Sequence, residues 1–326
     1  MMARRVTDRS RGRIAVLGAA SPAGAHVKAA LADRGVPGDR VDLYGHRREV
    51  AVLSEYDGEA RLVQPSVELD AAACAVVFVC ELGHDGADLT TAAASGTLVV
   101  DLTGSIAGAV LAGCAATTSG TGLVAVPHPV TMLLLALLAP IHEAIGVTRG
   151  SCFVARPASD FGEAGLEELR EQTVHLLRFE PTPTEVFGRQ LAFNVLPEHL
   201  FPLGEDAAGE RIARECRALL RAPELPVVVS LALVPSFFGH AVAAHLDLAG
   251  PGREEALAAW RDAPGVNIAV DEETGTTLDA PEGPGILLAR VDVVGPSTLR
   301  IWALGSEAGA TAAARAIAVG VEAGAL

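Results

Sequence analysis

Residues 13–24 read Arg-Ile-Ala-Val-Leu-Gly-Ala-Ala-Ser-Pro-Ala-Gly, and this stretch decides the fold class. The apolar run from Arg13 to Leu17 is typical of a buried strand, and helical spacing of apolar residues starts at Gly24. Glycines at a strand-to-helix turn let the backbone approach a pyrophosphate, and the helix offers its free N–H groups. The turn predicts a dinucleotide site, with a plain tight turn in an α/β domain as the alternative. The candidate cofactor-binding residues are Gly18, Ala20, Ser21, Ala23 and Gly24, and Ser21 stands where a middle glycine is expected.

Working outward, strand-like apolar runs alternate with Ala- and Gly-rich segments up to Pro127. The runs cover 41–44, 75–79, 98–102 and 123–126. Continuous apolar strands separated by helices indicate a parallel sheet covered on both faces. We therefore predict an N-terminal Rossmann-like domain over 1–127, whose residues 1–12 form a flexible basic arm.

Beyond Pro127 the pattern changes to longer strands with alternating or β-branched character. Helices are predicted at 131–144, 163–177, 211–220 and 308–325, and strands at 147–154, 227–234, 241–248, 286–293 and 299–304. This grouping indicates a second α+β domain with a mixed or antiparallel sheet. We place it at 128–304, and we expect 305–326 to form a C-terminal helix that returns to the N-terminal domain.

Composition limits the function classes. The chain has 326 residues, 50% of them apolar and 20% charged, which suits a globular protein of two domains. A net charge of −15 argues against binding to nucleic acid or to an anionic membrane surface. Five cysteines without a C-x-x-C pair indicate neither a disulfide framework nor a metal site, so we expect reduced thiols in a cytoplasmic protein. The most apolar stretch, 130–141, is too short to span a membrane.

The end of the second predicted strand bears on the choice of cofactor. The chain there reads Tyr44-Gly45-His46-Arg47-Arg48, without the acidic residue that usually binds the ribose hydroxyls of NAD. A guanidinium at Arg47 suits a 2′-phosphate, so NADP is the cofactor we expect if a dinucleotide binds. A solvated basic loop is the alternative.

Several further motifs occur in a fixed order along the chain. They are Pro140-Ile141-His142, Gly162-Glu163-Ala164-Gly165, Phe193-Asn194-Val195-Leu196-Pro197, Val234-Pro235-Ser236-Phe237-Phe238-Gly239-His240 and Thr277-Leu278-Asp279-Ala280. With the nucleotide turn, this order resembles the aspartate-semialdehyde dehydrogenase family over nearly the whole chain. The resemblance implies amino-acid biosynthesis, a homodimer formed through the second-domain sheet, and a thiol mechanism. In that mechanism a cysteine attacks an aldehyde, hydride passes to NADP, and phosphate releases the acyl group.

The resemblance also implies where the catalytic groups belong, and most of them are absent. Pro129 falls on the position of the nucleophilic cysteine, Arg156 on that of the glutamine, and Leu233 on that of a substrate-binding arginine. His240 matches the acid/base histidine, and Arg211 replaces a substrate-binding lysine. A proline offers no nucleophile, so we expect no thiohemiacetal to form at this position.

Two functions remain open at this point. The first is a pseudoenzyme of this family, a binding or regulatory homodimer that keeps the NADP site. The alternative is an NADP-dependent oxidoreductase without a catalytic cysteine, in which His240 or His128 acts as acid/base, and Arg211 and Arg156 bind a small-molecule substrate. His240 also has a structural interpretation as a packed or hydrogen-bonded residue, and the sequence offers no partner for His128. A purely structural subunit that pairs with an active family member is a third possibility.

Overall fold

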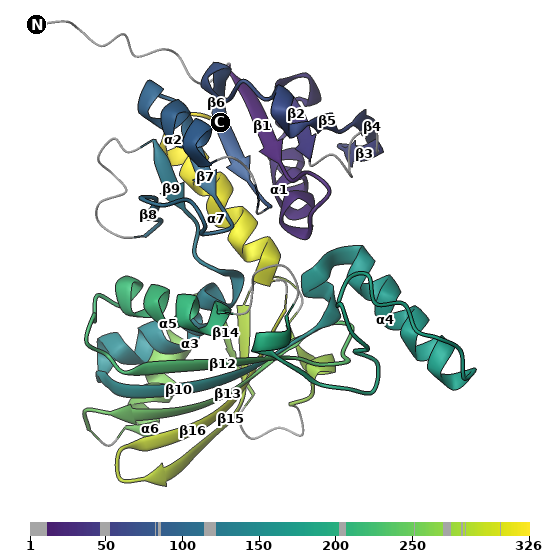
Figure 1. Ribbon diagram of the computed structural model, residues 1–326. Helices are drawn as coiled ribbons and strands as arrows, with labels where there is room; N and C mark the ends of the chain where they lie inside the picture. The colour runs from purple at the N-terminus through teal and green to yellow at the C-terminus, as the bar shows by residue number, and fades with distance from the viewer. Residues whose placement is uncertain are drawn as a thin grey trace, which may run out of the picture. The chain divides into compact units, whose positions relative to one another are not determined.

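The computed structural model describes residues 12–45, 53–81, 83, 86–113, 122–201, 207–250, 252–269, 275–281, 283, 285–306 and 308–326 (Figure 1). Backbone contacts divide the chain into two compact units. One unit contains residues 1–128 together with 309–326, and the other contains 129–308. Each unit has a seven-stranded sheet of its own.

The first unit is built on a sheet in which every strand pair runs parallel. Its strands, in spatial order, are β5 (Gln64–Pro65), β2 (Val41–Gly45), β1 (Arg13–Leu17), β6 (Cys74–Val79), β7 (Leu98–Asp101), β9 (Leu123–Ala125) and β8 (Val110–Leu111). The prediction of a Rossmann-like parallel sheet is confirmed.

Helices cover both faces of this sheet, because successive side chains of each strand point to opposite sides. Ile14 and Val16 of β1 pack in one cluster with α1 (Pro22–Asp33) and α7 (Ala308–Glu322). Ala15 and Leu17 pack in another cluster with α2 (Gly86–Ser95). A hairpin of β3 (Leu53–Tyr56) and β4 (Glu59–Leu62), which the sequence did not predict, completes the described part of this unit.

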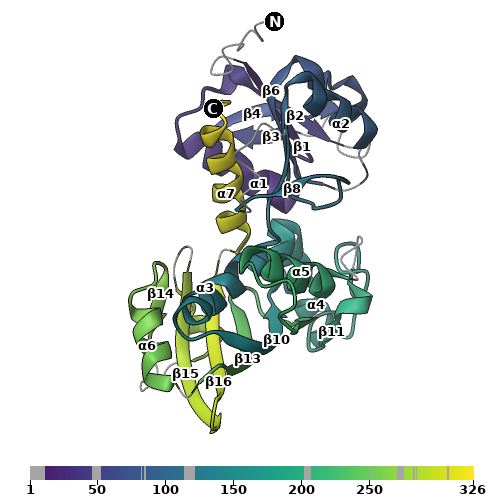
Figure 2. The same cartoon turned by 90° about the vertical axis from the view of Figure 1, so that its left-hand side faces the viewer.

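The second unit has a mixed sheet, as predicted. Its strands, in spatial order, are β11 (Leu196–Pro197), β12 (Val227–Leu233), β10 (Val147–Arg156), β13 (His240–Leu248), β16 (Thr298–Ser306), β15 (Gly285–Gly295) and β14 (Val266–Ile268). The pairs β10–β12 and β14–β15 are parallel, and the other pairs are antiparallel. Figure 2 shows β14 at one edge of the sheet beside α6 (Arg253–Arg261).

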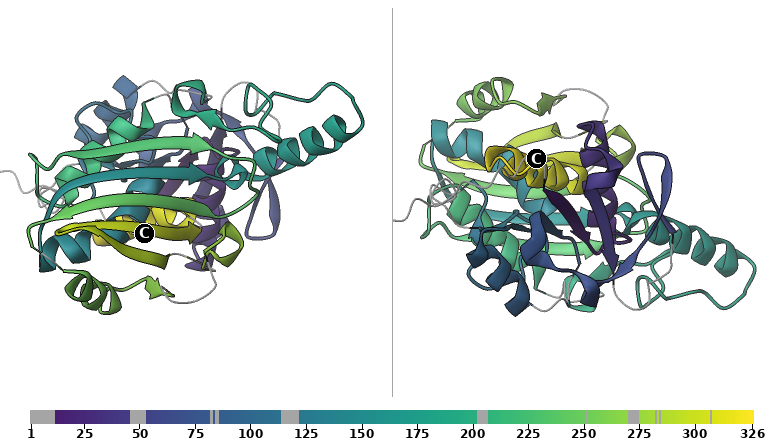
Figure 3. Two further views of the ribbon diagram at one scale, coloured as in Figure 1. Left: turned by 90° about the horizontal axis from the view of Figure 1, so that it is seen from below. Right: turned by 90° about the horizontal axis from the view of Figure 1, so that it is seen from above.

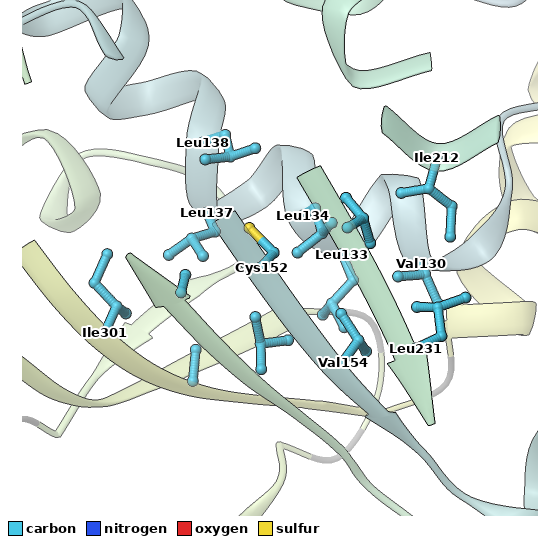
Figure 4. Close-up of a cluster of buried hydrophobic side chains, with 14 of the residues drawn as sticks. Val130, Leu133, Leu134, Leu137, Leu138, Cys152, Val154, Ile212, Leu231 and Ile301 are labelled. Atoms are coloured by element: carbon cyan, nitrogen blue, oxygen red, sulfur yellow. The ribbon is translucent and has the colours of Figure 1, made fainter. Parts of the chain in front are cut away.

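Three helices cover one face of the second sheet, namely α3 (Pro129–Ala144), α5 (Ala208–Leu219) and α6. Leu134 and Leu137 of α3 lie against Cys152 and Val154 of β10 in this core (Figure 4). The described residues place no helix on the opposite face, as the view from below shows (Figure 3, left). Phe153 follows the buried Cys152 on β10, so its side chain points away from this core, and it is exposed.

An arm leaves the sheet after β10. The helix α4 (Gly162–Leu177) runs away from the strands (Figure 1), and the chain then returns along it. The buried Gln172 side chain binds this return segment, since its Nε2 donates to the carbonyl of Pro183 at 2.8 Å and its Oε1 accepts from the amide of Leu191 at 2.7 Å. The buried Glu168 accepts the amides of Val186 and Phe187 in the same way.

Candidate functional site

The nucleotide turn has the backbone that its glycines predict. Gly18 directly follows β1 and has φ +82°, a left-handed conformation that residues with a side chain rarely adopt. A Cβ at Gly24 would lie 2.2 Å from the Gly18 carbonyl oxygen, so glycine is needed for the helix to approach the strand this closely. The turn and the start of α1 therefore fit the close backbone approach of a dinucleotide fold.

The side chain of Ser21 caps α1. Its Oγ accepts the amide of Gly24 at 3.0 Å, and its hydroxyl lies 2.7 Å from the carbonyl oxygen of Gly18 and 3.0 Å from that of Cys80. Ser21 was predicted from the sequence to be a cofactor-binding residue, but these contacts were not predicted. Arg47, predicted to bind the 2′-phosphate, lies outside the described residues.

The position expected for the nucleophile is the first residue of α3. Pro129 begins the helix, a place that suits proline because the first helical N–H has no partner within the helix. Two residues on, the buried Thr131 donates its hydroxyl to Oε2 of Glu215 at 2.6 Å. Glu215 also accepts from Nε of Arg211 at 2.7 Å through its other oxygen. Glu215 thus ties the start of α3 to α5, and it engages the Arg211 guanidinium that was predicted to bind substrate.

The described cysteines are free; Cys80, Cys152 and Cys216 are buried, and Cys74 is partly exposed. Burial raises the pKa of Cys152 to about 12 and that of Cys74 to about 11, and it also raises the pKa of Cys80 and of Cys216. The thiolate is the reactive form of cysteine, and catalytic cysteines have lowered pKa values. None of these four thiols fits a nucleophile, and Cys114 lies outside the described residues.

The second unit also holds a buried charged cluster of Arg156, Asp160 and His240. Arg156 ends β10, Asp160 lies in the short helical turn Ala158–Phe161, and His240 begins β13. Nε of Arg156 donates to Oδ2 of Asp160 at 2.6 Å, and Nε2 of His240 lies 3.1 Å from the same oxygen. The Arg156 guanidinium also lies over the rings of Phe161 and Phe201, at 5.9 and 5.6 Å from their centres.

Asp160 is the charged centre of this cluster. Burial raises the pKa of its carboxyl, but the positive charges of His240 and Arg156 and their hydrogen bonds outweigh burial and hold the pKa well below its usual value. An ionised carboxylate only accepts hydrogen bonds, so Nε2 of His240 carries the proton between them. The other ring nitrogen, Nδ1, is buried and has no hydrogen-bond partner in the described part of the chain.

Sequence reasoning found two of these three residues. Arg156 and His240 came from the family pattern, whereas Asp160 was missed, although an Arg-x-x-x-Asp spacing directly after a strand was visible. The same holds for Glu215, four residues after Arg211. His128, the second acid/base candidate, is buried directly before α3 and belongs to the other unit. The proposed roles of these residues stay predictions.

Within the described residues, no three His, Cys, Asp or Glu side chains are grouped so as to hold a metal ion. No described helix combines the length and apolar content needed to cross a membrane.

The structure defines a class of two-unit α/β folds, with a parallel Rossmann-type sheet in one unit and a mixed sheet in the other. Residues 138–306 match the family model described as "Semialdehyde dehydrogenase, dimerisation domain". The chain belongs to the aspartate-semialdehyde dehydrogenase family.

Individual relatives agree with this assignment over most of their length. The chain is 25% identical over 322 residues to aspartate-semialdehyde dehydrogenase 2 of Vibrio cholerae, covering 94% of this chain and 96% of that one. It is 28% identical over 295 residues to the USG-1 protein homolog of Azotobacter vinelandii, covering 81% and 82%.

Solved structures support the fold. The crystal structure of the Vibrio cholerae aspartate semialdehyde dehydrogenase II complexed with ASA has a TM-score of 0.79 and 24% identity, over 96% of this chain and 98% of that one. The aspartate semialdehyde dehydrogenase of Candida albicans, crystallised with NADP, has a TM-score of 0.66 and 15% identity, over 96% and 98%.

Proposed function

We propose that this protein is an NADP-binding homodimer of its family that lacks phosphorylating semialdehyde dehydrogenase activity. The observation that carries the proposal is the first turn of α3, where Pro129 stands at the position that the family pattern gives to cysteine. A proline nitrogen within a peptide bond has no proton and no nucleophilic lone pair. The four described cysteines do not compensate, because burial raises the pKa of each of them.

The loss of the substrate clamps supports the same proposal. Leu233 replaces the arginine that would hold the substrate carboxylate, and it is fully buried. Arg156 and Arg211 each hydrogen-bond an internal carboxylate. An apolar side chain cannot compensate the charge of a bound carboxylate, which costs several kcal/mol to bury unpaired.

The test is phosphate-dependent reduction of NADP in the presence of aspartate semialdehyde. We expect no turnover above the rate without enzyme. A turnover of about 1 s⁻¹, the low end of typical enzymes, would refute the proposal. The Vibrio cholerae relative, assayed in parallel, shows that the substrate and assay are sound.

NADP binding is the second part of the proposal. The left-handed Gly18 and the close approach at Gly24 support it, as does the neighbouring structure crystallised with NADP. Ala20 and Ala23 would hold the pyrophosphate with their amides, and Arg47 would meet the 2′-phosphate. When bound, NADPH supplies a hydride to a carbonyl carbon.

The homodimer would form through the helix-free face of the second sheet. Two cross-strand rows run over this face. One row contains Ser230, Phe153, Ala243, Trp302 and Arg290, and the neighbouring row contains Val228, Ser151, His245, Arg300 and Asp292. Exposed Phe153, Val228 and Trp302 give the face an apolar centre, which is the usual composition of a stable interface. We expect the protein to sediment with twice the 33.4 kDa mass of one chain.

A cysteine-free reductase is the second candidate function, and the buried His240 favours it. Because Nε2 donates its hydrogen bond to the ionised Asp160, Nδ1 of the imidazolium form of His240 is the ring atom that would give a proton to the oxygen of a carbonyl. With hydride from bound NADPH reaching the carbonyl carbon and this proton reaching the oxygen, the product would be an alcohol and His240 would be left neutral. Asp160 would balance the charge of the imidazolium before the proton leaves and after it is regained from solvent.

The second candidate is tested by NADPH oxidation with a panel of aldehydes and ketones, using the wild-type protein and the His240→Gln variant. Turnover that is lost in the variant, while its melting curve stays cooperative, supports a reductase. Turnover that the variant retains, or no turnover with any carbonyl, rejects His240 as the proton donor. The free thiols of the described cysteines support a reducing, cytoplasmic location for either function.

A further inference from the structure

The side chain of Ser21 occupies hydrogen-bonding capacity that a pyrophosphate needs. Its Oγ accepts from the amide of Gly24 in the first turn of α1. Its single proton is donated to the carbonyl oxygen of Gly18 or to that of Cys80. The contact with Cys80 links the turn to the residue that follows β6. A hydroxyl has one donor, so the proton used internally is not offered to a phosphate oxygen. The remaining lone pair of Oγ cannot bind a phosphate oxygen, since both atoms are acceptors.

The other amides of the turn are also largely engaged. The amides of Gly18 and Ala19 both donate to the carbonyl oxygen of Tyr44, at 2.9 and 3.0 Å. The amide of Ser21 donates to the Gly18 carbonyl at 3.0 Å, and Pro22 has no N–H. Of the turn from Gly18 to Gly24, only the amides of Ala20 and Ala23 have no acceptor within the described part of the chain.

These contacts leave two backbone amides of the turn, those of Ala20 and Ala23, as hydrogen-bond donors for a pyrophosphate. A dinucleotide fold binds pyrophosphate through the free N–H groups at the start of the first helix. Here the Gly24 amide is bound by Ser21, and the first helical position, Pro22, has none to give. The backbone shape suits the cofactor, but the number of hydrogen-bond donors is low.

We propose that Ser21 is an affinity-determining residue, which closes the start of α1 and keeps dinucleotide binding weak. This inference rests on the proposed NADP site. It predicts a gain of function, since removing the hydroxyl releases the Gly24 amide for a phosphate oxygen. Ser21 has φ −69°, a conformation open to any residue, so alanine or glycine at this position adds no backbone strain.

The experiment is titration of the intact protein with NADPH, followed by the change in nucleotide fluorescence, and with NADP by calorimetry. The variants are Ser21→Ala, Ser21→Gly and a double variant that combines Ser21→Gly with Pro22→Ala. The second substitution gives residue 22 a backbone N–H. One hydrogen bond to a charged group corresponds to about a tenfold change in Kd. We therefore expect Ser21→Gly to bind about tenfold more tightly than wild type, and the double variant more tightly still.

Thr276→Ala is the matched control. Thr276 caps a helical turn through its hydroxyl, as Ser21 does, but it lies in the second unit. This variant loses a cap of the same kind and should bind NADPH as the wild type does. Thermal melts of all variants verify that each is folded.

The outcomes separate this inference from the proposed function. Tighter binding by the Ser21 variants supports the inference, including the case in which the wild type binds too weakly to measure. Equal binding by the wild type and the variants overturns the inference and leaves the NADP site standing. Absence of binding in every variant overturns both.

Discussion

The substitution Asp160→Asn removes one charge from the buried cluster and keeps the shape of the side chain. In the wild type, Asp160 neutralises Arg156, whose side chain is only 6% exposed. After the substitution, the guanidinium remains among the rings of Phe161 and Phe201 without a carboxylate. Breaking a buried ion pair by removing one partner typically costs about 3–5 kcal/mol, because the remaining charge is uncompensated.

This cost converts to a melting temperature. For domains of 150–250 residues, 1 kcal/mol corresponds to about 2–4 °C. We therefore expect Asp160→Asn to lower the Tm of the transition that includes the second unit by about 6–20 °C. The double variant Arg156→Gln with Asp160→Asn carries neither charge and should recover at least about half of the loss.

The effect also has a predictable pH dependence. The pKa of Asp160 in the folded protein lies below its usual value of 3.8, so the carboxylate stabilises the fold wherever it is ionised. Such a contribution is fully present above the unfolded pKa and is lost as pH falls through the folded pKa. The stability difference between wild type and Asp160→Asn should thus be constant above about pH 5 and shrink in stronger acid.

Differential scanning calorimetry and urea unfolding between neutral and acidic pH measure these quantities. Glu167→Gln is the control, since Glu167 pairs with Arg170 on the surface of α4 and its loss should leave Tm unchanged. A Tm for Asp160→Asn within about 2 °C of wild type would refute the ion-pair account, because it would mean a cost below about 1 kcal/mol. A double variant no more stable than Asp160→Asn would show that Arg156 does not depend on Asp160.

Three further predictions concern other parts of the molecule. In the native protein, the buried Cys80, Cys152 and Cys216 should stay unmodified by iodoacetamide at neutral pH while the unfolded chain is alkylated, as peptide mapping would show; rapid native labelling of any of these three contradicts the burial argument. Phe153→Asp should convert the dimer to a monomer in sedimentation, whereas Val67→Asp on the exposed surface of the first unit should not. If both variants remain dimers, the interface lies elsewhere. Gln172→Ala removes the hydrogen bonds to the return segment of the arm, so protease cleavage between 183 and 192 should become faster; cleavage at the wild-type rate argues that Glu168 alone holds the arm.

The parts of the fold that sequence could predict are those governed by local pattern. The buried strand before Gly18 and the helix after it follow from apolar spacing and one glycine turn, and both lie within two residues of the predicted limits. Helix α6 was missed although Arg253-Glu254-Glu255-Ala256-Leu257 has helical spacing, because the proline and glycine before it indicated a loop. The hairpin of β3 and β4 was missed because most of its side chains are exposed and form no apolar run.

The candidate site was harder to predict, because its contacts join distant parts of the chain. Asp160 and His240 are separated by 80 positions, and only the pairing of β10 with β13 brings them together. Thr131 and Glu215 are separated by 84 positions in the same way. Ser21 was recognised as unusual, but its hydroxyl also contacts the carbonyl of Cys80, which lies 59 positions away, directly after β6.

The central claim is that no atom at the start of α3 forms a covalent acyl adduct. Intact-protein mass spectrometry after incubation with aspartate semialdehyde and NADP, without phosphate, tests it most directly. The Pro129→Cys variant is the control for access, since a thiol at a helix N-terminus should be alkylated by iodoacetamide. We predict that the wild-type protein keeps its unmodified mass. An adduct of acyl mass on any residue of the wild-type protein would contradict the account.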